Sequence, residues 1–270
     1  MTKIEIPLNH PRRISLETRE RVIEGHESNI VATAGLLAHG RGEAFDYLIG
    51  EKTTELAEHA IRAAVAAMLS ADHPVISVNG NVCSLVPEDI VKLSKICNAP
   101  LEINLFYYRK EREDAIKRAL MEVGAKEILG THDRPSAIIP ELSSNRRKVD
   151  PNGIGAADVI LVPLEDGDRT EALKAIGKFV ITIDLNPMSR TAIHSDITIV
   201  DNITRALPLM VEKARDMKKL AKDELRKITR GFDNSENLAM SVQIIMKHLE
   251  ESANNIGKLR TKFKAGANYK

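Results

Sequence analysis

The sequence contains no tryptophan, and aromatic residues make up only 3% of its 270 residues. A core with so few rings has to be filled by isoleucine, valine, leucine and alanine. Cys83 and Cys97 are too few and too unpatterned for a disulfide framework or a zinc site, and they indicate a reducing compartment. The net charge of +1 provides no field that would draw the whole protein to nucleic acid or to a membrane surface.

Targeting and anchoring segments are also missing from the pattern. No apolar stretch near the start resembles the hydrophobic region of a signal peptide, and no run approaches membrane-spanning length. We therefore expect a cytoplasmic protein. Its hydrophobic content of 43%, with 29% charged residues, fits one sizeable domain with an appended helical part, or two small domains.

Familiar short motifs of nucleotide-binding and hydrolytic enzymes are absent as well. There is no G-x-x-x-x-G-K-[ST] phosphate loop, no G-x-S-x-G elbow and no H-E-x-x-H pair. Gly153 and Gly155 precede an expected strand, whereas a dinucleotide fingerprint has to follow one. A nucleotide would therefore have to be held by polar groups at strand ends and by scattered arginines.

The middle of the chain alternates short β-branched, apolar runs with helical patterns. The expected strands cover residues 75–79, 101–106, 126–129, 159–163, 179–184 and 197–200. The expected helices between them cover 87–96, 111–123 and 169–176, and Asp168 with Glu171 forms a capping box for the last. This alternation predicts an α/β fold with a parallel sheet flanked by helices, although the sequence does not reveal the strand order.

Helical patterns flank this alternation on both sides. They cover residues 16–25, 30–39, 53–69, 204–229 and 235–252. Gly40 and Gly42 are expected to break the second of these patterns. The segment from residue 257 to the end carries lysines and Arg260 without acids, and we interpret it as a frayed end in preference to a nucleic-acid-binding arm.

These patterns divide the chain into three regions. They are an N-terminal helical region (1–72), a nucleotide-binding core (73–203), and C-terminal helices with a basic tail (204–270). We expect the three to be integrated into one domain.

Polar residues follow the expected strands, at 79–81, 104, 130–132, 163–167, 184–186 and 201–202. Loops are polar in general, so any one of these ends is ordinary. The carboxyl ends of parallel strands share one edge of a sheet, and ligands of open α/β sheets bind in the crevice there. Taken together, the strand ends predict a ligand site.

The stretch after residue 179 is the most informative strand end. Asp184 and Asn186 stand directly at the end of an expected strand, with Arg190 and Thr191 a short loop away. A carboxylate can accept a ribose hydroxyl, an amide can read a base edge, and an arginine can grip a phosphate with paired donors. The alternative is that Asp-Leu-Asn-Pro is only a turn, because these residue types favour turns.

Two other segments carry arginines that could bind anions. Arg41 is bracketed by glycines and has little to pack against, although it could equally be a surface arginine after a helix C-cap. The longest break in the alternation, 132–155, contains Arg146, Arg147 and Lys148. Long connections in compact domains are usually functional. The alternative there is a solvated basic turn.

Several longer stretches carry a family resemblance. They are GRGEAFDY (40–47), SVNGN (77–81), RPSAIIPE (134–141), SNRRKVD (144–150), DLNPMSRT (184–191) and DNITR (201–205). Together they resemble the archaeal 4-phosphopantoate–β-alanine ligases, also called phosphopantothenate synthetases. The resemblance runs from the N-terminal helices to about Arg205, and the C-terminal helices carry no motif that matches.

The resemblance implies a chemistry that the residues alone could not name. It implies a homodimer with a Rossmann-like sheet that joins 4-phosphopantoate to β-alanine, with ATP and Mg²⁺, to make 4'-phosphopantothenate for coenzyme A biosynthesis. A carboxylate is a poor acceptor for an amine at neutral pH, so ATP has to activate it first. The family releases AMP and pyrophosphate, which implies an acyl-adenylate intermediate.

The resemblance also implies which residues contact ATP. Carried over motif by motif, these positions are Arg19, Arg41, Asp184, Leu185, Asn186, Arg190, Thr191, Asn202 and Ile203. The acid and amine sites are inferred from the loops alone. Their candidates are Asn79, Asn81, Asn104, Arg146, Arg147 and Lys148.

The catalytic base is not carried over. His132, a loop histidine, is the candidate, and a solvated side chain is its alternative. No metal ligand from the protein is predicted, and the H-x-G-H loop of bacterial-type pantothenate synthetases is absent. Two other functions remain open, namely a nucleotide-sensing dimer without turnover, and an ATP-dependent ligase or kinase acting on another small acid.

Overall fold

The expected strands assemble into one six-stranded parallel sheet in the computed structural model, which describes residues 6–10, 12–142 and 144–266. The sheet strands are β1 (Pro74–Val78), β2 (Leu101–Ile103), β3 (Ile128–Leu129), β6 (Val159–Leu161), β7 (Phe179–Ile183) and β8 (Ile197–Ile199). A separate antiparallel pair consists of β4 (Ala137–Ile138) and β5 (Lys148–Val149).

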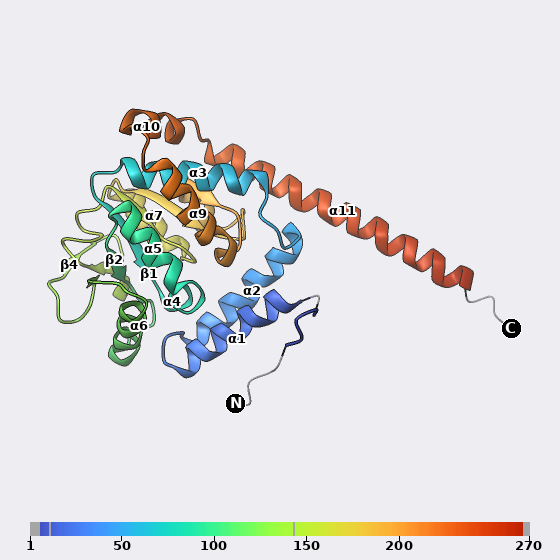
Figure 1. The fold of residues 1–270 in the computed structure, drawn as a ribbon, viewed down its shortest axis with the longest axis horizontal. Helices are drawn as coiled ribbons and strands as arrows, with labels where there is room; N and C mark the ends of the chain where they lie inside the picture. Colours follow the sequence, from blue (N-terminus) through green and yellow to red (C-terminus); the bar gives the residue numbers. More distant parts are fainter. Residues whose placement is uncertain (1–5, 11, 143, 267–270) are drawn as a thin grey trace.

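The helices precede, connect and follow these strands (Figure 1). They are α1 (Arg13–Glu27), α2 (Thr33–Ile49), α3 (Glu55–Ser70), α4 (Gly80–Leu85), α5 (Pro87–Cys97), α6 (Lys110–Glu122), η1 (Asn145–Arg147), α7 (Gly167–Ala175), α8 (Arg190–His194), α9 (Ile203–Met217), α10 (Lys222–Arg230) and α11 (Asn234–Gly266).

The strand order explains why the sheet is Rossmann-like. The order is β3-β2-β1-β6-β7-β8, with every neighbouring pair parallel. Counted in chain order, this is 3-2-1-4-5-6, the order of the doubly wound dinucleotide-binding sheet. The order reverses between β1 and β6, which confirms the predicted fold class and locates its switch point.

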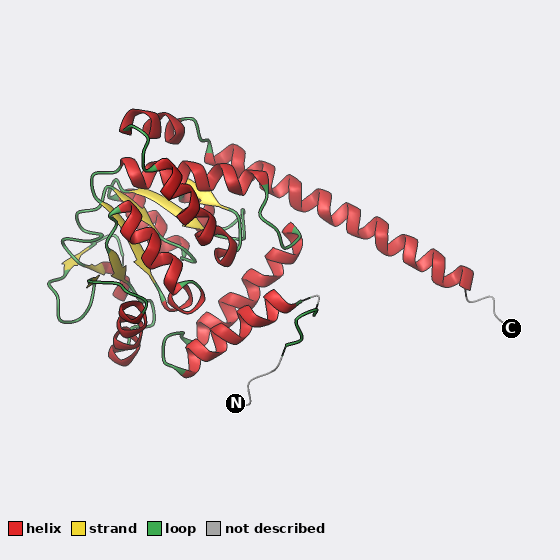
Figure 2. Cartoon of the chain, viewed as in Figure 1, coloured by secondary structure: helices red, strands yellow, loops and turns green. Residues whose placement is uncertain are grey.

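Successive residues of each strand pack on opposite faces of the sheet. Ile76, Leu161 and Ile181 belong to the larger core, under α3, α5 and α9. Their neighbours Val75 and Ile160 belong to a smaller core with α7 and the segment between β4 and β6. The sheet is therefore covered on both sides, as Figure 2 shows, and its strands are mostly apolar because neither face meets solvent. The buried polar exceptions are Ser77, Glu102, Thr182 and Thr198.

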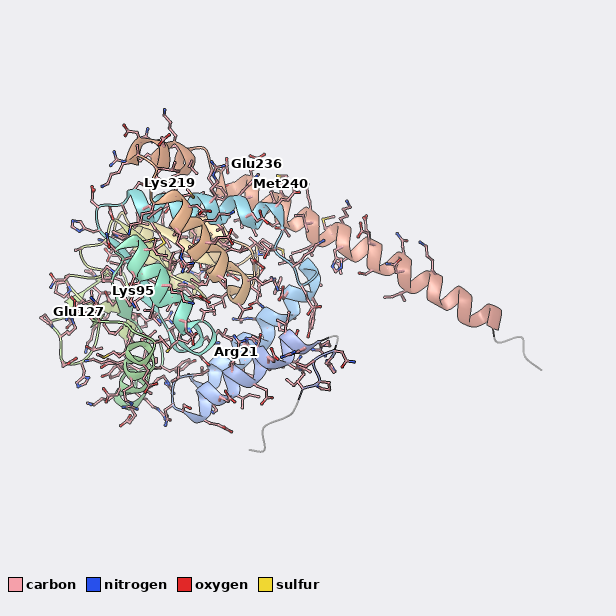
Figure 3. All side chains as sticks on the ribbon, in the orientation of Figure 1. Arg21, Lys95, Glu127, Lys219, Glu236 and Met240 are labelled. Carbon is pink, nitrogen blue, oxygen red and sulfur yellow. The ribbon has the colours of Figure 1, made fainter. Side chains whose placement is uncertain are left out.

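The N-terminal and C-terminal helices meet beside the sheet. The end of α2 and the base of α11 share a third apolar cluster with β8 and α8, through residues such as Ile49, Leu185 and Leu238. The 33-residue α11 then runs away from the body toward the C-terminus (Figure 1). Charged side chains such as Lys95, Glu127 and Lys219 point outward from different parts of the surface (Figure 3).

One helix contradicts the expectation of a break at Gly40 and Gly42, because α2 continues through both to Ile49. Gly40 and Gly42 have open space or ordinary contacts around them, whereas a third glycine of α2, Gly35, is closely packed. A Cβ on Gly35 would lie 2.3 Å from Oδ1 of Asn81, whose amide donates to the Gly35 carbonyl at 2.9 Å. A helix can carry exposed glycines when tertiary packing holds it, at a cost of about 1 kcal/mol each.

Other boundaries also differ from expectation. The predicted helix 204–229 is two helices, because the chain turns after Met217 so that α10 can pack on α3 and bury Leu225. The cap of α7 is Asp166, not Asp168, since the helix begins earlier than predicted. The last helix runs on to Gly266. Residues 267–270 of the expected frayed tail lie outside the described residues.

Candidate active site

A cleft of about 740 Å³ opens at the carboxyl edge of the sheet. Its lining comes from α2, from the loops after β1, β2, β6 and β7, from η1, and from the start of α9. These loops sit on both sides of the strand-order reversal, where doubly wound sheets bind ligands. The size falls within the range usual for small-molecule sites.

Polar residues at the strand ends begin the helices that follow. Asn79 accepts from the backbone of Val82 and caps α4, while Asp166 caps α7, Ser189 caps α8 and Asn202 caps α9. All four capping residues line the cleft, so four helix N-termini meet there. Unpaired N–H groups and the helix dipole make such ends favourable for anions, above all on the longer helices α7 and α9.

The predicted turn and the predicted site coincide at Asp184. Its Oδ1 accepts from the backbone N–H of Asn186 at 2.9 Å, and its Oδ2 accepts from the Ser189 hydroxyl at 2.5 Å. Burial raises the pKa of Asp184, although the Ser189 hydrogen bond opposes this. The turn therefore holds the carboxylate in place at the cleft, and no arginine in the described chain pairs with it.

Most residues carried over from the family's ATP motifs lie on this side of the cleft. The lining residues among them are Arg41, Asp184, Leu185, Asn186, Arg190, Thr191, Asn202 and Ile203. Arg19 is set back from the lining. It forms an ion pair with Glu43 at 2.7 Å, and Glu43 does line the cleft.

Only some of the residues expected to hold the substrates line the cleft. Asn79, Asn81 and Arg146 line the cleft, whereas Arg147 and Lys148 are exposed outside it. Asn104 is buried beneath, where its amide donates to the carbonyls of Arg146 and Lys148 at 3.3 and 3.1 Å.

The four arginines of the cleft differ in their partners. Arg146 pairs with Glu165 and Asp166, and Arg190 pairs with Asp168 and Glu171, the latter two at 2.8 Å. Arg41 and Arg112 have no carboxylate partner among the residues that the structure describes. Two of the four arginines thus form no ion pair, although the charge of Arg41 acts on Asp184 and opposes the rise of its pKa.

A buried ion network supports the cleft floor. Arg169 is fully buried and donates to Glu165 and, at 3.0 Å, to the hydroxyl of Ser77. Glu165 in turn pairs with Arg146. Burial lowers the pKa of both arginines to about 10, which leaves them protonated at neutral pH. The network fixes the 164–167 loop between the two halves of the sheet.

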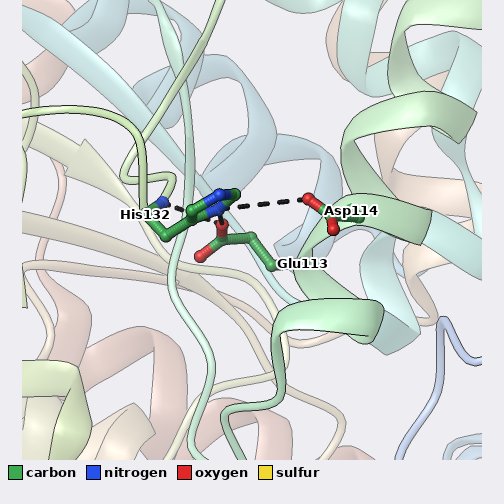
Figure 4. Close-up of side chains that lie close together, drawn as sticks. All are labelled: Glu113, Asp114 and His132. Carbon is green, nitrogen blue, oxygen red and sulfur yellow. Dashed lines mark hydrogen bonds and ion pairs between the residues drawn. The ribbon is translucent and has the colours of Figure 1, made fainter.

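His132 does not line the cleft. Its Nδ1 lies 2.6 Å from Glu113, and its backbone N–H donates to the same carboxylate at 2.8 Å (Figure 4). These residues and Asp114 are the one group in the described chain whose side chains could together hold a metal ion. The position gives His132 no contact with a molecule in the cleft.

The cleft residues that were not predicted from the sequence include a histidine and an arginine. His39 lines the cleft from α2, and burial lowers its pKa. It directly precedes the GRGEAFDY motif, and this position could have indicated His39 as a site residue. Arg112 lies in the first turn of α6, within a run of charges that resembles a solvated helix face. Its place just after β2, at the carboxyl edge, was the only available signal.

Comparison with known proteins gives consistent matches. The sequence model of a family described as phosphopantothenate/pantothenate synthetase matches residues 56–248. The chain is 59% identical to a 4-phosphopantoate–β-alanine ligase of Thermococcus kodakarensis, over 87% of this chain and 90% of that protein. It is 51% identical to the ligase of that name from Methanosarcina mazei, over 94% and 99% of the two chains.

A more distant relative agrees with these two. The 4-phosphopantoate–β-alanine ligase of Methanospirillum hungatei is 45% identical over 90% of this chain and 98% of its own. Separately, none of the helices in the described residues is both long and apolar enough to span a membrane.

Proposed function

The chain belongs to the phosphopantothenate/pantothenate synthetase family, and from this we propose that it joins 4-phosphopantoate to β-alanine, with ATP as the co-substrate. The product is 4'-phosphopantothenate, a precursor in coenzyme A biosynthesis. The observation that carries the proposal is the cleft at the strand-order reversal, which gathers residues of most motifs that mark the family.

ATP binds in the half of the cleft formed after β7 and β8. The support is the convergence of the α8 and α9 N-termini with Arg41 and Arg190 on one side of the sheet. Backbone N–H groups and arginines together suit a polyphosphate. Arg19 acts through Glu43, which it holds at the edge of this half.

Magnesium bound together with ATP would neutralise charge on its phosphates. Mg²⁺ is usually bound by phosphate oxygens, waters and one or two carboxylates. The cleft offers one acid that fits, since Asp184 is not engaged by an arginine, whereas Glu43, Glu165 and Asp166 are.

The reaction runs in two steps. The substrate carboxylate attacks the α-phosphate of ATP, forming a mixed anhydride with AMP and releasing pyrophosphate. The amine of β-alanine then attacks the acyl carbon, forming the amide bond and expelling AMP. The arginines and helix N-termini of the cleft stabilise the charge that develops on the phosphates. The absence of a phosphate loop that would present a γ-phosphate supports attack at the α-phosphate.

His39 is the base that takes a proton from the attacking amine. It is placed in the cleft from α2, one helical turn before Glu43. Because burial lowers its pKa, the imidazole is unprotonated at neutral pH and can accept a proton. The negative charge of Glu43 opposes this lowering of the pKa, and the positive charge of Arg19 adds to it.

The protein acts as a homodimer in the cytoplasm. The support for a dimer is α11, which runs away from the body (Figure 1) and carries exposed Met246, Leu249 and Ile256. Apolar side chains at such spacing form one stripe of a helix, and a second copy would cover it. The free thiols of Cys83 and Cys97 agree with a reducing compartment.

Product analysis tests the ligase. The protein is incubated with ATP, Mg²⁺ and β-alanine, together with either 4-phosphopantoate or pantoate. AMP, pyrophosphate and 4'-phosphopantothenate are the expected products with the phosphorylated acid. When the acid carries ¹⁸O in its carboxylate, label should appear in AMP. ADP as the nucleotide product would exclude the adenylate route, and ATP binding without turnover of any acid would indicate a nucleotide sensor.

A further inference from the structure

Arg112 is a buried arginine of the cleft that has no acid to balance its charge. The residue is only 9% exposed and lies in the first turn of α6, directly after the loop that follows β2. Its Nη1 donates to the Tyr107 carbonyl at 2.5 Å, and its Nε is buried without a hydrogen-bond partner in the described chain. Burial, followed by the nearby charge of Arg109, lowers its pKa.

Buried charges in proteins are normally paired, because removing an ion from water is costly unless a counter-ion or hydrogen bonds replace the water. The other buried arginines of this region follow that rule, since Arg146 and Arg169 both reach Glu165. Arg112 departs from it while facing a ligand cleft. We therefore expect an anionic group of a bound ligand to pair with Arg112.

The position of Arg112 in the sheet indicates which anion this is. Arg112 follows β2, whereas Asp184 follows β7, and the order β2-β1-β6-β7 places three strand spacings between them. At about 4.8 Å each, this amounts to roughly 14 Å across the cleft. Two anionic groups can thus be bound at separate ends.

The proposed reaction indicates which anionic group binds at each end of the cleft. The carboxylate of the acid substrate has to meet the α-phosphate of ATP, which binds on the β7 side. The phosphate at the far end of the same acid then extends toward β2. We propose that Arg112 binds this phosphate and sets the preference for the phosphorylated acid, an inference that rests on the proposed ligase function.

This assignment differs from the expectation that Arg146, Arg147 and Lys148 hold the phosphate. The charge of Arg146 is already matched by Glu165 and Asp166, and the other two side chains stand outside the cleft. An arginine with an unused Nε can present two donors to a phosphate in the paired geometry that lysine lacks.

The test compares Arg112→Gln with Arg118→Gln, which removes an exposed arginine from the same helix. Initial rates of AMP formation give KM for 4-phosphopantoate and for ATP. Pantoate affinity is measured as a substrate or, without turnover, as a competitive inhibitor. Arg112→Gln should raise the KM for 4-phosphopantoate by about 10- to 100-fold, the usual loss of affinity for one charge-assisted contact. The affinity for pantoate and the KM for ATP should change little, and all three values for Arg118→Gln should match those of the wild type.

The preference for the phosphorylated acid is the deciding readout. An unchanged KM for 4-phosphopantoate overturns the assignment, and so does an equal loss of affinity for 4-phosphopantoate and pantoate. Arg112→Lys keeps the charge without the paired donors and should give an intermediate loss, so it decides the question if Arg112→Gln does not fold. Failure of the wild type to ligate 4-phosphopantoate would instead reject the proposed function, whatever Arg112 does.

Discussion

Glu102 is a carboxylate buried in the sheet without exposure to solvent. It accepts the backbone N–H groups of Asp150 at 3.0 Å and Ile154 at 2.6 Å, and so ties the long loop to β2. Burial raises its pKa from 4.5 to about 7, against the opposing effect of these hydrogen bonds. The folded state therefore holds the proton of Glu102 more tightly than the unfolded chain does.

A raised pKa of an acid means that its contribution to stability falls as pH rises. Between the unfolded pKa near 4.5 and the folded pKa near 7, the folded protein binds more protons, so the free energy of unfolding decreases with pH. From pH 5 to pH 8 the contribution of Glu102 should fall by about 2–3 kcal/mol. Urea unfolding of the wild type and Glu102→Gln at both pH values measures it. A stability difference between the two proteins that does not change with pH would contradict this.

His39 is expected to act only in the second step of the reaction. Exchange of labelled pyrophosphate into ATP needs 4-phosphopantoate but no amine, so His39→Gln should retain it. Amide formation should fall by about 10²- to 10⁴-fold, the usual contribution of a general base. In the wild type, activity should fall at low pH as His39 becomes protonated, with a pKa below the ordinary 6.5 of histidine. The residual activity of the variant should not show this decrease.

Equal loss of exchange and amide formation in His39→Gln would place His39 in adenylate formation or binding, contrary to the proposal. Glu58→Gln, an exposed change in α3 outside the cleft, serves as the matched control and should leave both rates unchanged.

At the residue scale, the sequence predicted the cleft where motifs mark strand ends. Asp184 lines it because it directly follows β7, Asn186 because it lies in the same turn, and Asn202 because it caps α9. Arg147 and Lys148 do not, because they belong to η1 and β5, two short elements whose orientation depends on tertiary contacts. Arg112 was missed because burial of a charge in a charged helix cannot be read from composition.

At the element scale, two glycines give opposite expectations for stability. Gly40 lies within α2 with nothing within 4 Å of an added Cβ, so Gly40→Ala should raise the free energy of unfolding by about 0.5–1 kcal/mol. A Cβ on Gly80, at the start of α4, would lie 2.2 Å from the Ile30 carbonyl oxygen. Because that neighbour is backbone, Gly80→Ala should cost about 1–3 kcal/mol.

Thermal and urea unfolding of both variants check this pair. Destabilisation by Gly40→Ala would show that α2 is broken at Gly40, as the sequence pattern had indicated. A neutral Gly80→Ala would mean that the Ile30 segment moves freely away from α4.

The strands of the sheet were predicted from their apolar pattern. All six sheet strands were expected, because buried parallel strands are short apolar runs between turn residues. The short elements outside the sheet, β4, β5, η1, α4 and α8, were not, since one turn or one residue pair carries no recognisable pattern. The division of 204–229 into α9 and α10 was missed because packing on α3 decides it.

At the scale of the whole molecule, the distal part of α11 is expected to join two copies. The 33 residues of the helix span about 50 Å. Exposed Leu249 and Ile256 lie seven residues apart on one face. A double change to Leu249→Glu and Ile256→Glu should turn a dimer into a monomer, because two charges in an apolar contact oppose association.

Light scattering after size exclusion gives the mass of each species. Asn254→Glu adds a charge to another face of the same helix and should leave the dimer intact. A monomeric wild type would reject the proposed dimer, and a double variant that stays dimeric would place the contact elsewhere. We also propose that the three regions form one domain, since α2 lines the same cleft as the sheet loops.

The reversal of strand order between β1 and β6 has a consequence for how such an enzyme diverges. In the proposed assignment, loops after β1 and β2 meet the acid, and loops after β7 and β8 meet most of the nucleotide, with Arg41 of α2 in addition. The two recognition tasks are then encoded largely in separate stretches of the gene. Mutation in the first stretch can exchange one acid for another without altering the second. A lineage can thus acquire new substrates while it inherits unchanged the means of activating a carboxylate with ATP.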